Sequence, residues 1–187
     1  IECVKSGDAP ARAAAAAALD RHLNLLPDGD ARAVTLSGEV LDAFPAAGDA
    51  GKRAILNLIP AVLKRAAGAH ARRCRAVVAE ALRMPDPGAQ LAAARLAIHP
   101  EVRLRAELKP LLTSPEPQLR GAALFAVAVG GDGEPALGDE ELFRWLHDPD
   151  PTVQKVCRDA LVSRDRSEGE IALGRRLTHP DATERLK

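Results

Sequence analysis

The sequence predicts an all-α protein, and its composition, turn spacing and internal repeat all support this fold class. Of the 187 residues, 37 are alanine and 25 are leucine, whereas aromatic residues make up only 2%. Alanine and leucine are strong helix formers, while β-sheets favour β-branched and aromatic residues. The composition therefore argues for helices and against a β-sandwich or barrel.

Turn-forming residues cut the chain into segments of helical length. Asp8 can cap a first helix that has Pro10 in its first turn, and the Pro-Asp-Gly-Asp run at 27–30 ends this helix. Pro45 ends the second helix, and Asp49 can cap the third. The predicted helices, in chain order, span residues 8–26, 31–44, 49–67, 70–84, 89–98, 101–113, 117–129, 139–146, 151–163, 167–177 and 181 onward.

The later helices are delimited in the same way. Gly68 separates the third helix from the fourth, the Pro-Asp-Pro-Gly run at 85–88 ends the fourth, and Pro100 follows the helix at 89–98. The helix at 117–129 differs from the others because apolar residues cover nearly its whole circumference. We expect neighbouring helices to bury it on several sides.

The turn between paired helices repeats along the chain. Residues 112–123 (Leu-Thr-Ser-Pro-Glu-Pro-Gln-Leu-Arg-Gly-Ala-Ala) align without gaps with residues 146–157 (Leu-His-Asp-Pro-Asp-Pro-Thr-Val-Gln-Lys-Val-Cys) at an offset of 34. A third copy begins at Leu177, 31 residues later. Hairpins that repeat in this way stack side by side and share a continuous core. The helix at 89–98 interrupts the alternation of two helices per repeat.

This repeat resembles the HEAT-type repeat, in which a turn of the Asp-x-Asp-Pro type leads into Val-Arg-x-x-Ala on the second helix. Residues 147–161 carry the resemblance, and so do Leu119 and Arg120. Gln154 stands where the family has arginine, and Cys157 stands where it has alanine. The resemblance therefore implies that the ladder of Asp and Arg side chains that often ties HEAT repeats together is incomplete here.

The resemblance also implies the architecture, a right-handed α-α superhelix, or α-solenoid, of stacked HEAT-like hairpins. It is clearest over residues 101–187, looser over 49–84 and weakest over 1–48. We expect residues 1–187 to form a single α-solenoid domain. Because the chain opens with Ile1 rather than Met and stops soon after a third turn, we also expect it to be a fragment of a longer protein.

The sequence predicts no catalytic, metal or cofactor site. The five histidines show no metal-ligand spacing, and Cys74 and Cys157 lie on apolar helix faces, where cysteine is usually a small core residue. The Gly-Gly-Asp-Gly run at 130–133 follows a helix rather than a strand, unlike a phosphate-binding loop. Three scattered cysteines favour a reducing compartment, and no apolar stretch approaches about 18 residues, so we expect a cytoplasmic protein without a membrane segment.

The distribution of charge is the feature that bears most on function. The chain has 26 basic and 26 acidic residues, yet residues 1–51 carry a net charge of −4, residues 52–120 carry +8 and residues 121–187 carry −4. Arginines of the basic middle would attract an acidic partner if they share one face; alternatively, they are solvated or paired with neighbouring acids. The candidate binding residues are Arg72, Arg73, Arg75, Arg103, Arg105 and Arg120.

We therefore expect a non-catalytic interaction or scaffold module that binds a protein or peptide, favouring an acidic one, and no small-molecule substrate. The alternative is binding of a DNA or RNA phosphate backbone through residues 52–120, which the neutral charge and scarce aromatic residues disfavour. A third class is enzymatic, because some HEAT-like proteins excise damaged bases with Trp and Asp in a basic cleft. Trp145, the only tryptophan, lies in the acidic third, so we expect it to pack between helices, with an exposed anchor as the alternative.

Overall fold

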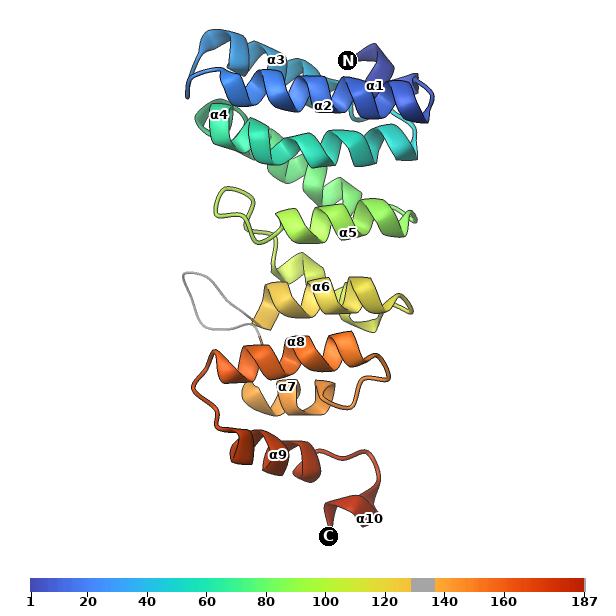
Figure 1. Ribbon diagram of the computed structural model, residues 1–187, viewed down its shortest axis with the longest axis vertical. Helices are drawn as coiled ribbons and strands as arrows, with labels where there is room; N and C mark the ends of the chain where they lie inside the picture. The colour runs from blue at the N-terminus through green and yellow to red at the C-terminus, as the bar shows by residue number, and fades with distance from the viewer. Residues whose placement is uncertain (129–136, 187) are drawn as a thin grey trace. The chain divides into compact units, whose positions relative to one another are not determined.

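The computed structural model describes residues 1–128 and 137–186, and every regular element in these ranges is helical (Figure 1). Ten α-helices and one 3-10 helix, η1, make up this part of the chain, so the all-α prediction is confirmed. The chain divides into two compact units, Ile1–Leu104 and Arg105–Lys187. The glycine-rich run at 130–133 and the predicted end of the helix at 117–129 lie outside the described residues.

The first unit is organised around one long helix. Its elements are α1 (Glu2–Ser6), α2 (Ala9–Leu25), α3 (Ala31–Asp42), α4 (Asp49–Ala81) and α5 (Pro87–Leu96). The other four helices all pack against α4. The Asp8 side chain caps α2 as predicted, accepting a hydrogen bond from the backbone N–H of Ala11, and the Asp86 side chain caps α5 by accepting one from Ala89. The predicted cap at Asp49 is wrong, because Gly48 is the N-cap of α4 and Asp49 lies in its first turn.

α4 is bent at Ala66, where the backbone (φ −139°, ψ 23°) is not helical. The sequence predicted this break two residues later, at Gly68. The loop between α2 and α3 holds the bend at its observed place, because the Gly29 N–H donates to the Arg65 carbonyl at 2.9 Å and the Arg65 guanidinium donates to Asp28 at 2.5 Å. A contact between distant segments thus fixes the position of the break.

α1 was not predicted, and Gly51 on α4 explains how it packs. A Cβ atom at position 51 would lie 2.9 Å from the Val4 carbonyl oxygen and 2.8 Å from that of Lys5. Only glycine allows the backbone of α1 to approach α4 so closely.

The prediction of a helix at 101–113 is wrong for its first five residues. Residues 101–105 have no helical structure, and only η1 (Ala106–Thr113) is helical. Arg103 has a left-handed backbone (φ 48°), which an α-helix does not contain. Pro110 inside η1 lacks the N–H that a continuous α-helix requires.

The second unit is a series of short helices. Its elements are η1, α6 (Pro117–Ala128), α7 (Asp139–Trp145), α8 (Pro151–Val162), α9 (Glu168–Leu177) and α10 (Ala182–Arg185). α6 packs against η1 and α8, while α7, α8 and α9 pack against one another. α6 is less enclosed than predicted: Leu119, Leu124 and Val127 are buried, but Phe125 is 47% exposed.

Turns that align in the sequence share one hydrogen-bonding pattern. Ser114, Asp148 and His179 occupy equivalent positions, and the side chain of each accepts a hydrogen bond from the backbone N–H two residues later. The donor–acceptor distances are 3.2, 2.8 and 3.1 Å respectively. A hydroxyl, a carboxylate and an imidazole therefore stabilise the same turn.

A fourth copy of the turn lies at residues 82–93 (Leu-Arg-Met-Pro-Asp-Pro-Gly-Ala-Gln-Leu-Ala-Ala), 30 residues before the copy at 112–123. α5 begins at Pro87 after the cap Asp86, just as α8 begins at Pro151 after the cap Asp150. α5, which corresponds to the helix predicted at 89–98, thus begins after a turn of the same kind as α8 and packs against α4.

Candidate functional site

Three candidate arginines lie on the part of α4 that follows its bend. Arg72 and Arg75 are exposed, and neither side chain has an ion-pair or hydrogen-bond partner among the described residues. They are three positions apart and so share one face of the helix. Arg73 instead pairs with Asp42 of α3 and donates to the Gly38 carbonyl at 3.4 Å. We call Arg72 and Arg75 the α4 arginine face.

No acidic side chain in the described part of the chain forms an ion pair with this face. Glu80, further along α4, pairs with Lys52 at 3.5 Å. Arg83, just beyond the end of α4, is exposed and also lacks a side-chain partner among the described residues. Sequence reasoning did not include Arg83, although it lies in the segment recognised as basic.

Arg103 and Arg105 belong to different units. Arg103 is exposed in the first unit, and its Nε donates to the Pro100 carbonyl at 2.6 Å. Arg105 is half-buried, opens the second unit immediately before η1, and has no side-chain partner in the described part of the chain. No hydrogen bond or ion pair joins either residue to the α4 arginine face.

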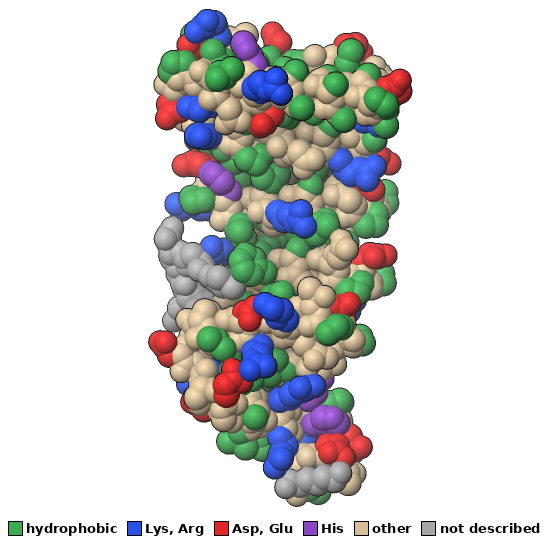
Figure 2. All heavy atoms as spheres, in the orientation of Figure 1, with side chains coloured by type: hydrophobic (Ala, Val, Ile, Leu, Met, Phe, Trp, Pro, Cys, Tyr) green, Lys and Arg blue, Asp and Glu red, His purple; other side chains and the backbone are tan. Residues whose placement is uncertain are grey.

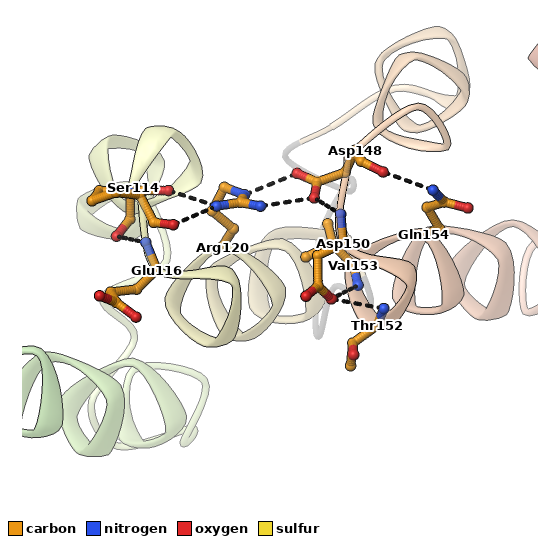
Figure 3. Close-up of polar contacts among 9 residues, drawn as sticks. Ser114, Glu116, Arg120, Asp148, Asp150, Thr152, Val153 and Gln154 are labelled. Atoms are coloured by element: carbon orange, nitrogen blue, oxygen red, sulfur yellow. Dashed lines mark hydrogen bonds and ion pairs between the residues drawn. The ribbon is translucent and has the colours of Figure 1, made fainter.

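Arg120 is built into the second unit, contrary to its prediction as a binding residue (Figure 3). Its Nε and Nη2 donate to the two carboxylate oxygens of Asp148, each at 2.8 Å, and its Nη1 donates to the carbonyls of Ser114 and Pro115 at 2.9 and 3.0 Å. The Arg120 and Asp148 side chains are only 11% and 3% exposed. The pair ties the turn before α6 to the turn before α8, and Arg120 is not available to a partner.

Hydrogen bonds keep Asp148 ionised in spite of its burial. Burial alone raises the pKa of a carboxyl group, but the hydrogen bonds from Arg120 and from the Asp150 N–H outweigh it, and the pKa of Asp148 falls below the ordinary value of 3.8. The buried pair is therefore charged at neutral pH and makes two charge-assisted hydrogen bonds.

The next step along the second unit lacks an ion pair of this kind. Gln154, in the position equivalent to Arg120, donates its amide to the Asp148 backbone carbonyl at 2.7 Å. The rings of His147 and His179 meet edge to face, with 5.0 Å between their centroids, and His147 Nε2 lies 2.8 Å from the Arg175 carbonyl. One Arg–Asp pair therefore joins the turns before α6 and α8, and a glutamine stands in the equivalent position of the next turn.

The described residues contain no group of three or more His, Cys, Asp or Glu side chains placed to hold a metal ion. No helix in this part of the chain is long and apolar enough to cross a membrane. Trp145 is half-buried on α7. Comparisons with protein-family models, curated proteins and solved structures found no match.

Thiol reactivity should separate the three cysteines. Burial raises the pKa of Cys74 to about 11 and that of Cys157 to about 12, whereas Cys3 is exposed. Because the thiolate is the reactive form, we expect the native protein at pH 8 to react rapidly with Ellman's reagent at one thiol, and the protein in denaturant to react at all three. A Cys3→Ser variant should lose the rapid phase; rapid reaction of a second native thiol would contradict the burial of Cys74 and Cys157.

Proposed function

We propose that this chain is a HEAT-like α-solenoid and a non-catalytic interaction module, and that its α4 arginine face binds an acidic segment of a partner protein. The solenoid part of the proposal is supported by the four copies of one turn and by the Arg120–Asp148 pair between successive turns. The binding part rests on one observation: Arg72 and Arg75 are exposed, lie on one helix face and have no partner among the described residues.

The geometry of the face suits carboxylate groups. A separation of three residues places the two Cα atoms about 4.5 Å apart along the helix axis. A guanidinium group binds a carboxylate through two parallel hydrogen bonds, so adjacent acidic residues of one peptide can engage both arginines. An unpaired arginine has no internal ion pair to break when such a peptide binds.

The surroundings favour a peptide over a nucleic acid. Phe44 is the only Phe, Tyr or Trp in the first unit, and it is buried, so this unit offers no exposed Phe, Tyr or Trp ring on which bases could stack. On the face shown in Figure 2, Lys and Arg side chains are interspersed with acidic and apolar ones.

Charge reversal on α4 tests the proposal. We expect the double variant Arg72→Glu/Arg75→Glu to bind a fluorescein-labelled polyglutamate peptide at least about tenfold more weakly than the unmodified chain, because each charged hydrogen bond contributes about 1.5–3 kcal/mol. Fluorescence anisotropy at fixed low salt measures the affinity. The matched control is Arg21→Glu/Arg176→Glu, which makes the same change of net charge at two exposed residues outside α4.

The control should bind the peptide within about twofold of the unmodified chain, since neither of its substitutions is on α4. Equal losses in the two double variants would show that only net charge matters and would reject the α4 site. Binding of generic duplex DNA at about 50 mM salt, with a steep salt dependence that the α4 variant abolishes, would replace the peptide proposal with the nucleic-acid alternative.

A further inference from the structure

A groove of about 440 Å³ lies between α8 and α9 in the second unit. Residues 151, 154, 155 and 158 of α8 line one side, and residues 168, 171, 172 and 175 of α9 line the other, with Leu146 at the end of α7. In both helices the positions follow the pattern i, i+3, i+4, i+7, so one face of each helix borders the groove. The volume falls within the range of about 300–1,000 Å³ that is usual for ligand sites.

The groove combines an apolar floor with a basic rim. Leu146 and Ile171 are buried, with 4% and 6% of their surface exposed, and they form the floor beside Ala172. Lys155, Arg158 and Arg175 stand on the rim with a single acidic residue, Glu168, so the lining carries a net charge of +2. Residues 121–187 carry a net charge of −4, so the lining of the groove is positively charged within an acidic segment. Lys and Arg side chains are visible over α8 and α9 in Figure 2.

Internal contacts leave the rim open to new partners. The Arg175 side chain has no hydrogen-bond or ion-pair partner among the described residues. Arg158 pairs with Glu168 at 2.7 Å and Lys155 pairs with Asp159 at 2.6 Å, and all four side chains are more than half exposed. Exposed pairs of this kind contribute about 0–1 kcal/mol, so a carboxylate from outside can replace the internal one at little cost.

We infer that this groove binds an acidic peptide segment of a partner protein that carries an aliphatic side chain between its carboxylates. The aliphatic side chain covers Ile171 and Ala172, while carboxylates reach Arg175 and Lys155. This inference deepens the proposed function, on which it rests, by giving the second unit a site of its own and by adding an apolar requirement that the α4 arginine face lacks.

Paired substitutions test the charge of the rim. With a labelled peptide of alternating glutamate and leucine, we expect Arg175→Glu to weaken binding at least about tenfold, because it replaces attraction with repulsion at the unpaired guanidinium. Arg176→Glu makes the same charge change at the next residue, which is exposed but does not line the groove, and should stay within about twofold. Equal losses in these two variants would overturn the site.

A second pair tests the apolar floor without changing charge. Ala172→Trp should fill the groove and weaken binding about tenfold, whereas Leu173→Trp, at an exposed residue outside the lining, should have little effect. Circular dichroism of each variant verifies folding. Unchanged binding by Ala172→Trp, or displacement of the peptide by inorganic phosphate or duplex DNA, would overturn an aliphatic-acidic occupant.

The two proposals fail separately. If Arg72→Glu/Arg75→Glu loses binding and Arg175→Glu does not, the α4 arginine face stands and the groove is rejected. If Arg175→Glu and Ala172→Trp lose binding of the glutamate–leucine peptide while the α4 variant retains it, the groove stands without the α4 site.

Discussion

Replacing Asp148 with alanine is expected to lower the free energy of unfolding of the second unit by about 3 kcal/mol. The substitution removes both carboxylate contacts of Arg120 and leaves a guanidinium that is only 11% exposed without its counter-ion. Hydrogen bonds from Arg120 to the carbonyls of Ser114 and Pro115 remain, which places the loss at the lower end for a broken buried pair. Urea unfolding monitored by the fluorescence of Trp145, the only tryptophan, measures it.

Two further variants isolate the cause. Asp159→Ala removes an exposed ion pair with Lys155 on α8 and should cost less than about 1 kcal/mol. Arg120→Leu/Asp148→Leu removes both charges together and should be less destabilising than the sum of the single substitutions, because no unpaired charge is buried. A loss in Asp148→Ala no greater than that in Asp159→Ala would contradict a stabilising role for the Arg120–Asp148 pair.

The contribution of this pair should also depend on pH. Because the pKa of Asp148 is lowered in the folded protein, its ionisation stabilises the fold above the unfolded pKa of about 3.9, and this stabilisation is lost as pH falls through the lower folded value. The difference in stability between the unmodified chain and Asp148→Ala should therefore be constant from pH 7 to about pH 5 and shrink below about pH 4. A difference in stability between the two proteins that grows as the pH falls would contradict a lowered pKa of Asp148 in the folded protein.

Replacing Phe44 with alanine is expected to cost the first unit about 3–4 kcal/mol. Phe44 is fully buried just after α3, and the Lys52 ammonium group lies 5.2 Å from the centre of its ring. Alanine would leave a cavity and remove this cation–π contact, which contributes about 0.5–1 kcal/mol in such a setting. The change is measured by urea unfolding followed by far-ultraviolet circular dichroism.

The matched control is Phe125→Ala. Phe125 lies on α6 with 47% of its surface exposed, so its removal opens little cavity and should cost less than about 1 kcal/mol. If Phe125→Ala destabilised its unit as much as Phe44→Ala destabilises the first unit, α6 would be enclosed on all sides, as its sequence predicted.

Most helix boundaries could be predicted because they depend on residues close together in the chain. Asp150 accepts hydrogen bonds from the backbone N–H groups of Thr152 and Val153, and Pro151 stands in the first turn of α8. Such capping needs no tertiary contact. The same holds for the repeated turn, whose copy at residues 82–93 has two prolines, one on either side of Asp86.

The candidate site was predicted less well, because composition reveals how many charges a segment holds but not their partners. Arg72, Arg73 and Arg75 are neighbours in the sequence, yet Arg73 pairs with Asp42 at the end of α3, while the other two have no partner among the described residues. The basic rim of the groove between α8 and α9 could not be predicted from the charge of the segment, because residues 121–187 are acidic as a whole.

The sequence by itself determined that the chain is helical, where most of its helices begin and end, and that one turn recurs, because caps, prolines and helix propensity act over a few residues. Only the tertiary structure decided that Arg120 forms an ion pair with Asp148, 28 positions away. It also decided that the bend in α4 falls at Ala66, next to the contact between Arg65 and the loop that connects α2 and α3. The physical reason is that a side chain becomes structural or available according to the charges and carbonyls that the fold brings to it, and residues far apart in the chain supply these.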